Sequence, residues 1–157
     1  MNASRWLPTD STLVPTGEMA PVEGTPMDFL TAKSVGRDIN EDFSALKIGK
    51  GYDNCWVVDQ KPDIDGLSCV CRLSEPKSGR RLTIRSNHPG VQLYSGNWLS
   101  GSPLSKSATS YHDYDGIAIE CQELPDSPNK ENFPSTLLSV GEEYRRTIVF
   151  SIDNINE

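Results

Sequence analysis

Positive charge is scarce in this sequence. Its 15 lysines and arginines are outnumbered by 22 aspartates and glutamates, which gives a formal charge of −7 at neutral pH. Arg80, Arg81 and Arg85 form the only basic concentration, in an alternating stretch that favours a solvated hairpin. An acidic chain without a basic stripe is a poor candidate for binding nucleic acid or an anionic membrane. We therefore expect neither of these partners.

Long apolar runs are also missing. No stretch approaches the roughly 18 apolar residues that a membrane-spanning helix requires. The first ten residues, MNASRWLPTD, lack the apolar segment of a secretory signal. The sequence therefore predicts no membrane association and favours a cytoplasmic location.

Cysteine and histidine are too few and too dispersed for a metal centre. The four cysteines, at positions 55, 69, 71 and 121, form no CxxC pair, and the chain has only two histidines. A zinc site needs a denser Cys/His cluster, so we predict no metal site. We expect the thiols to be small, mostly buried groups in a reducing compartment, with Cys69 and Cys71 on the same face of one strand.

Helix-forming stretches are few as well. Four prolines divide residues 1–30 into extended segments. Only residues 31–48 have a helical period, and their polarity predicts a short or broken helix. Short strands fit the rest of the chain, at 55–58, 67–73, 80–86, 91–94, 117–122 and 144–152. We predict an all-β fold with residues 1–157 in a single domain.

Glu120 is the unusual residue in the strand predicted at 117–122. It shares one strand face with Ala118 and Gln122, while Ile119 and Cys121 lie on the other face. A carboxylate on the wet face of a strand is ordinary, and the local pattern alone favours that interpretation. A carboxylate partly withdrawn from water would instead have a raised pKa and could act as a base near neutral pH.

Five segments, in order along the chain, resemble the aldose 1-epimerases, also called galactose mutarotases. They are LVPTGEMAPVEGTPMDF (13–29), GYDN (51–54), PGVQLYSGN (89–97), ECQ with PDSPN (120–122 and 125–129), and FP with L and GEEY (133–134, 138 and 141–144). Each segment alone is a weak signal, but the ordered series covers nearly the whole chain. The resemblance implies a β-sandwich of the large supersandwich type, a free hexose such as galactose or glucose as substrate, and no cofactor.

The resemblance also implies roles for three residues. Interconverting the anomers of a hexose requires a base for the C1 hydroxyl proton and an acid for the ring oxygen. The family's base falls on Glu120, and its sugar-binding aspartate and glutamine fall on Asp53 and Gln92. The residue types suit these roles, because a carboxylate can accept and return a proton and Asp and Gln can pair with a polyol. Without the motif, Asp53 would be an ordinary turn aspartate.

The chain departs from the family pattern in three ways. It resembles only the C-terminal half of a full member, and Met1 lies just upstream of the matched region, as in a truncated or separately started product. The family's acid is a histidine of the N-terminal half, helped by a second one, and neither His88 nor His112 stands at a matching position. The histidine that usually follows the turn aspartate is Asn54 here. We expect self-association or a complementary N-terminal half, since half a sandwich exposes apolar faces and strand edges.

Other functions remain open at this point. The chain could be a sugar-binding domain that lacks the acid, an inactive remnant, or a phosphosugar epimerase whose phosphate pocket would need Arg80, Arg81 and Arg85. Tryptophans can stack on sugar rings, but we expect Trp6, Trp56 and Trp98 to pack in the core or at its rim.

Overall fold

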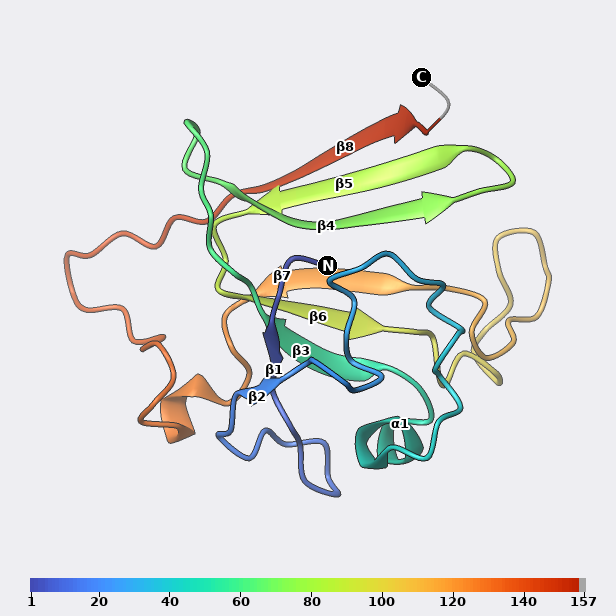
Figure 1. The fold of residues 1–157 in the computed structure, drawn as a ribbon, viewed down its shortest axis with the longest axis horizontal. Helices are drawn as coiled ribbons and strands as arrows, with labels where there is room; N and C mark the ends of the chain where they lie inside the picture. Colours follow the sequence, from blue (N-terminus) through green and yellow to red (C-terminus); the bar gives the residue numbers. More distant parts are fainter. Residues whose placement is uncertain (156–157) are drawn as a thin grey trace.

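The computed structural model describes residues 1–155 and consists mainly of two antiparallel β-sheets (Figure 1). The five-stranded sheet has the order β2 (Ala20–Pro21), β1 (Arg5–Trp6), β3 (Asp53–Val57), β6 (Gly90–Tyr94) and β7 (Ala118–Gln122). The three-stranded sheet has the order β4 (Ser68–Glu75), β5 (Arg80–Ser86) and β8 (Ile148–Asn154). Two short helices complete the fold, α1 (Ser44–Gly49) and the 3-10 turn η1 (Ser127–Asn129).

The main core lies between the two sheets. Trp56 and Val91 of the larger sheet belong to the same buried cluster as Val70 and Ile84 of the smaller one, and all four are fully buried. Full burial of each such side chain stabilises the fold by about 1.5–3 kcal/mol. Strand alternation sends these residues inward and leaves the opposite face of the larger sheet available for polar side chains. The predicted all-β sandwich is confirmed.

The predicted helix is shorter than its pattern suggested. Within residues 31–48 only the last part is helical, because α1 begins at Ser44. The carboxylate of Asp38 accepts hydrogen bonds from Lys33 and Arg37, and these contacts hold the preceding segment in turns. The last strand is also displaced, since β8 runs from Ile148 to Asn154 rather than from 144 to 152. No helix among residues 1–155 is long and apolar enough to cross a membrane.

The prediction that Cys69 and Cys71 share a strand face is wrong. A β-bulge at Val70 places Cys69 opposite Arg85 and Cys71 opposite Ile84. Because Arg85 and Ile84 are adjacent in β5, the two cysteines lie on opposite faces of the sheet. Cys71 is buried, Cys69 is half-buried, and all four cysteines are free thiols.

The strand orders of the two sheets run in the same direction across the sandwich. Asn2, just before β1, donates a backbone hydrogen bond of 2.8 Å to Val70 of β4. Arg146, just before β8, donates a hydrogen bond of 2.7 Å to Glu123, just after β7. The order β4-β5-β8 therefore follows the order β1-β3-β6-β7, which brings β8 to the side of the sandwich where β7 is the edge strand. We call β7 and β8 the open edges.

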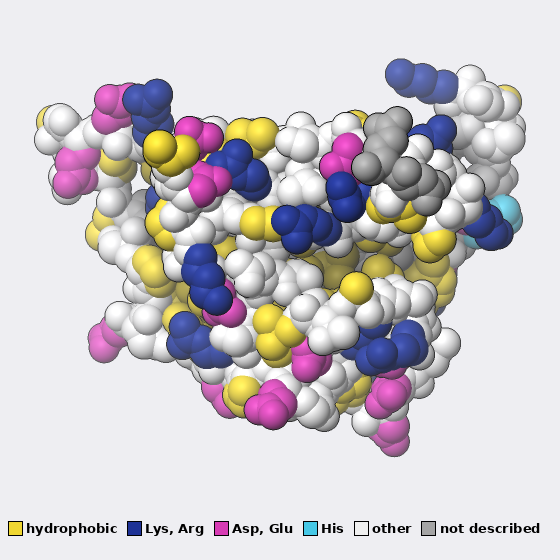
Figure 2. All heavy atoms as spheres, turned by 45° about the horizontal axis from the view of Figure 1, so that its top comes forward, with side chains coloured by type: hydrophobic (Ala, Val, Ile, Leu, Met, Phe, Trp, Pro, Cys, Tyr) yellow, Lys and Arg dark blue, Asp and Glu magenta, His cyan; other side chains and the backbone are white. Residues whose placement is uncertain are grey.

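Apolar side chains at the open edges are not covered. Phe150 lies opposite Ile84, and Ile152 lies opposite Leu82, so both share the core-facing side of their sheet. Ile84 is fully buried, whereas Phe150 is 58% exposed and Ile152 is 77% exposed. Figure 2 shows hydrophobic atoms along a hollowed band across the middle of the molecule. The connection before β8 adds more exposed apolar residues, at Leu137, Leu138 and Val140.

Candidate functional site

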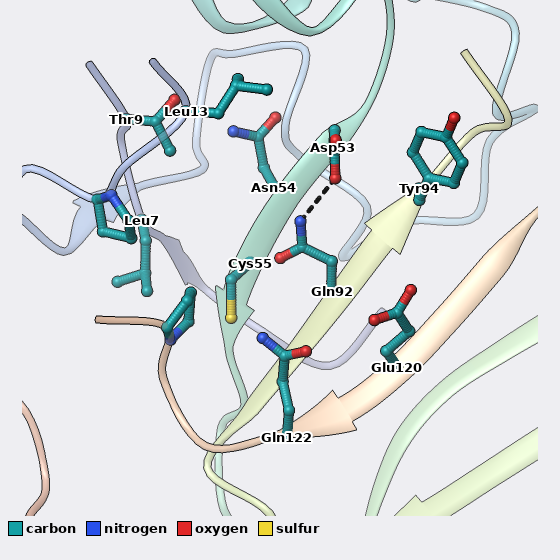
Figure 3. A pocket seen from close by; sticks show the side chains of 12 residues that line it. Leu7, Thr9, Leu13, Asp53, Asn54, Cys55, Gln92, Tyr94, Glu120 and Gln122 are labelled. Atoms are coloured by element: carbon teal, nitrogen blue, oxygen red, sulfur yellow. Dashed lines mark hydrogen bonds between the residues drawn. The ribbon is translucent and has the colours of Figure 1, made fainter. Parts of the chain in front are cut away.

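The three residues singled out by the sequence lie in one cavity. It has a volume of about 370 Å³ and opens on the face of the larger sheet that is turned away from the main core (Figure 3). Gln92 of β6 is the register partner of both Cys55 in β3 and Glu120 in β7. Asp53 lies two residues before Cys55 and therefore on the same face. Three adjacent strands thus present Asp53, Gln92 and Glu120 side by side.

Asp53 is held by its neighbour in the sheet. Gln92 donates a hydrogen bond of 2.8 Å from Nε2 to Asp53 Oδ1 (Figure 3). This bond leaves the second carboxylate oxygen of Asp53 and the carbonyl oxygen of Gln92 available as acceptors. Two neighbouring acceptors suit a ligand with hydroxyl groups on adjacent carbons.

A buried hydrogen-bond cluster fixes the turn that leads into Asp53. Asn97 donates from Nδ2 to the carbonyl oxygens of Gly49 and Tyr52, at 2.7 and 3.0 Å. Ser95 donates to Asn97 Oδ1 at 2.5 Å and accepts a hydrogen bond from the backbone N–H of Tyr52. The GYDN and YSGN segments therefore act together, because the second clamps the backbone of the first.

Gly51 explains why this turn needs a glycine. Its φ is +133°, outside the range that residues with a side chain readily adopt. A Cβ at this position would lie 2.5 Å from Asn97 Oδ1 and 2.8 Å from Ser95 Oγ. Any larger residue would therefore disturb the clamp that positions Asp53.

Glu120 faces water in this chain. Its side chain is exposed, and no residue among 1–155 forms a hydrogen bond or ion pair with its carboxylate. Of the two interpretations that the sequence left open, the wet-face one describes this structure. Figure 3 shows the carboxylate beside Gln92 and on the same side of the sheet as Tyr94. The location suits contact with a ligand in the cavity, but the burial that tunes a general base is not provided here.

The far wall of the cavity comes from the turn at residues 9–15. Asp10 builds this turn, because its Oδ1 accepts hydrogen bonds from the backbone N–H groups of Thr12 and Val14 and from the Thr12 hydroxyl. These bonds, those of Thr12 first, lower the pKa of Asp10 below its ordinary value. Leu13 has φ +65°, a left-handed conformation that is uncommon for leucine, and its side chain lines the cavity.

Neither histidine lines the cavity. His88 is 7% exposed, and its Nδ1 lies 2.9 Å from Ser86 Oγ on the smaller sheet. Burial lowers the pKa of this imidazole. His112 is exposed and lies beside Asp115. The residues lining the cavity therefore include no imidazole that could protonate a ring oxygen.

The basic residues and tryptophans also lie away from the cavity. Arg81 pairs with Asp153, and Arg85 pairs with Asp63, both at the smaller sheet. Trp6 and Trp56 are core residues. Trp98 is exposed, with the Lys50 ammonium 4.6 Å from its ring centroid. The arginines thus give no support to a phosphate pocket next to Glu120. Residues 1–155 also contain no group of three or more metal-binding side chains.

The structure adds cavity residues that sequence reasoning missed. Thr9, Leu13 and Gln122 line it, together with Asn54, which the sequence marked only as a replacement for a histidine. The sequence placed Gln122 on the strand face of Glu120 but assigned it no role. Local pattern assigns neither Thr9 nor Leu13 to a cavity, because both reach it through the turn that Asp10 stabilises.

Comparison with known proteins identifies the family. The family model for aldose 1-epimerase matches residues 1–151. Human galactose mutarotase is 37% identical over 150 residues, which are 96% of this chain and 42% of the human protein. The aldose 1-epimerase of Escherichia coli is 34% identical, over 90% of this chain and 40% of the bacterial protein.

Two solved structures of aldose epimerases have the same fold over nearly the whole of this chain. The GalM/aldose epimerase homologue from C. elegans superposes with a TM-score of 0.80 at 27% identity, over 99% of this chain and 45% of that protein. Galactose 1-epimerase from Lactobacillus acidophilus gives the same TM-score at 28% identity, over 98% and 42%. The chain belongs to the aldose 1-epimerase family, has part of its supersandwich fold, and spans about two fifths of the length of the curated relatives it matches.

Proposed function

We propose that this member of the aldose 1-epimerase family binds free hexoses such as galactose and glucose and supplies the base that interconverts their anomers. The strand register carries the proposal, because it brings Asp53, Gln92 and Glu120 to one face of the sheet and into one cavity. In this proposal Glu120 removes the proton from the C1 hydroxyl. Asp53 and Gln92 hold hydroxyl groups of the sugar.

The reaction requires a second group. When the C1 hydroxyl loses its proton, the bond between C1 and the ring oxygen breaks, and that oxygen must receive a proton. Rotation about the C1–C2 bond and ring closure then give the other anomer, while Glu120 returns its proton. Neither His88 nor His112 lines the cavity, so no histidine of the cavity wall can supply this proton.

We infer that the acid is carried by a polypeptide that covers the open edges. In a full family member this polypeptide corresponds to the N-terminal portion, which the present chain does not span. β7 carries Glu120, and no strand of the described part of the chain pairs with its outer edge. A strand added there would place its own side chains next to Glu120 on the same sheet face. The same polypeptide would bury Phe150 and Ile152 and withdraw Glu120 from water.

Anomer exchange tests this proposal. Freshly dissolved α-D-galactose and α-D-glucose are followed by NMR with the chain alone, with the portion of human galactose mutarotase that it does not match, and with both together. We expect sugar binding by the chain alone, and acceleration of exchange only when both polypeptides are present. Glu120→Gln should abolish that acceleration. Glu142→Gln, which alters an exposed carboxylate outside the cavity, should leave it unchanged.

A sugar-binding module without catalysis is the second candidate. The exposure of Glu120 and the absence of histidine from the cavity lining favour it for the chain acting alone. Binding without exchange, with the complementary polypeptide present, would establish this function instead. Failure to bind any hexose would eliminate both candidates and leave an inactive remnant.

We also propose that residues 1–157 act as one unit in the cytoplasm. The four free thiols support a reducing compartment.

A further inference from the structure

Asn54 has an unusual environment for a buried amide. Its side chain is only 1% exposed, yet neither Oδ1 nor Nδ2 has a hydrogen-bond partner among residues 1–155. The Thr9 hydroxyl is also buried and also lacks a partner. Both residues line the cavity that contains Asp53, Gln92 and Glu120. Buried polar groups are nearly always paired in folded proteins, so two unpaired groups in one cavity wall require an explanation.

The backbone explains how this recess arises. β1 pairs with β3 only as far as Trp6 opposite Trp56, so β3 has a strand partner at Asn54 on one side only, where Leu93 of β6 lies opposite. The chain instead turns away at residues 9–15, with a bridge between Thr9 and Pro15. Figure 3 shows the Asn54 amide directed toward Thr9 and Leu13, away from Gln92. The recess therefore adjoins the proposed sugar site without being part of the Asp53–Gln92 pair.

We propose that Asn54 and Thr9 form a subsite that takes one hydroxyl group of the bound hexose. This inference rests on the proposed function and adds a recognition element to the same cavity. A hydroxyl group is both a donor and an acceptor, and so is each side chain of the subsite. A carboxylate or phosphate would find no cation among the cavity-lining residues, and a metal ion would find too few anionic oxygens at the recess.

Leu13 supplies the apolar part of the subsite. Its left-handed backbone is maintained by the Asp10 turn and keeps the isobutyl group in the cavity wall beside Thr9. Uncommon backbone conformations of this kind often occur where a ligand is held. A hexose presents C–H groups between its hydroxyls, so an apolar wall next to a polar recess matches its surface. An ordered water molecule would satisfy the same amide, and titration with deoxy sugars distinguishes a bound water from a bound sugar hydroxyl group.

A double-mutant cycle between protein and sugar tests the subsite. Galactose and its monodeoxy analogues at C2, C3, C4 and C6 are titrated into the wild-type chain, Asn54→Ala and Thr9→Val, with binding followed by NMR shifts. We expect one analogue to bind the wild type about tenfold more weakly than galactose, corresponding to ~1.4 kcal/mol. In both variants this analogue should bind as tightly as galactose does. The other analogues should lose as much affinity relative to galactose as they do with the wild type. Asn132→Ala, an exposed asparagine outside the cavity, is the control.

Three outcomes are distinguishable. If the wild type binds galactose but every analogue keeps its penalty in both variants, the recess holds only water and the subsite is overturned while the proposed function stands. If the wild type binds no hexose, the proposed function and the subsite fail together. A selective loss of one penalty supports both.

Asn54→Leu provides a readout that does not depend on the choice of sugar. If the amide is kept for the ligand, replacing it with an apolar side chain of similar size removes an unpaired buried group, so the urea midpoint should stay the same or rise. Sugar affinity should fall in the same variant. A clear loss of stability would show that the amide supports the fold and would contradict the inference.

Discussion

Gln92 donates a hydrogen bond from Nε2 to Asp53 Oδ1 at 2.8 Å, across two neighbouring strands of the larger sheet. The bond orients a carboxylate that would otherwise rotate freely at the start of β3. It also determines which atoms remain for a ligand, namely the second oxygen of Asp53 and the carbonyl oxygen of Gln92. The two residues are therefore expected to act as a pair in sugar binding.

Replacing Gln92 by methionine should weaken hexose binding without unfolding the protein. Methionine keeps the length of the side chain but can neither hold Asp53 nor accept from a hydroxyl group. We expect an affinity loss of about tenfold, ~1.4 kcal/mol, in a titration with galactose. Asp53→Asn preserves an oxygen for the Gln92 bond but removes the charge, so it should fold normally and also bind more weakly. Unchanged affinity in Gln92→Met would rule out the pair as a ligand contact.

The clamp around Asn97 should matter for stability. Asn97→Leu removes the hydrogen bonds to the carbonyl oxygens of Gly49 and Tyr52 in a fully buried location. The Tyr52 carbonyl keeps the Ser95 backbone N–H as a donor, but the Gly49 carbonyl is left unpaired, which is expected to lower the free energy of unfolding by about 1–3 kcal/mol. Urea denaturation measures this loss. Asn132→Ala, which removes one exposed bond to Gly17, should cost less than about 1 kcal/mol, and a similar cost in both variants would contradict the clamp.

The sequence could predict those features that depend on local pattern. Period-2 alternation located the strands and placed Glu120 with Gln122, because side chains alternate between strand faces. It failed at Cys69 and Cys71, since a bulge adds one residue without any change in composition. It also missed Thr9, whose place depends on the turn that Asp10 stabilises and on the bridge between Thr9 and Pro15. Burial of Asn54 without a partner is a property of the packed cavity, which no local pattern reveals.

Stability should fall between neutral and mildly acidic pH because of His88. Burial, followed by the nearby Arg146, lowers the pKa of this imidazole in the folded protein. The unfolded chain then binds more protons, so stability is retained above the unfolded pKa of about 6.5 and is lost as the pH falls through it. His88→Gln should reduce the drop in urea midpoint between about pH 7 and pH 5.5.

His112→Gln is the matched control for that measurement. His112 is exposed, so its replacement removes an imidazole of the same kind without disturbing the buried site around His88. Equal slopes for the wild type and His88→Gln would mean that the buried imidazole does not contribute.

The exposed apolar residues of β8 should govern association. Phe150→Thr combined with Ile152→Thr keeps residues that favour strands and removes the two large apolar side chains from the open edge. Because both side chains are already exposed, the free energy of unfolding should change by less than about 1 kcal/mol. Sedimentation velocity should show less concentration-dependent association than for the wild type, and the affinity for the complementary polypeptide should fall. Ile64→Thr changes a fully exposed isoleucine in a loop away from β8, so association and affinity should not change. If the wild type stays monomeric and the double variant keeps its affinity for the complementary polypeptide, the open edges bind neither a second copy of the chain nor that polypeptide.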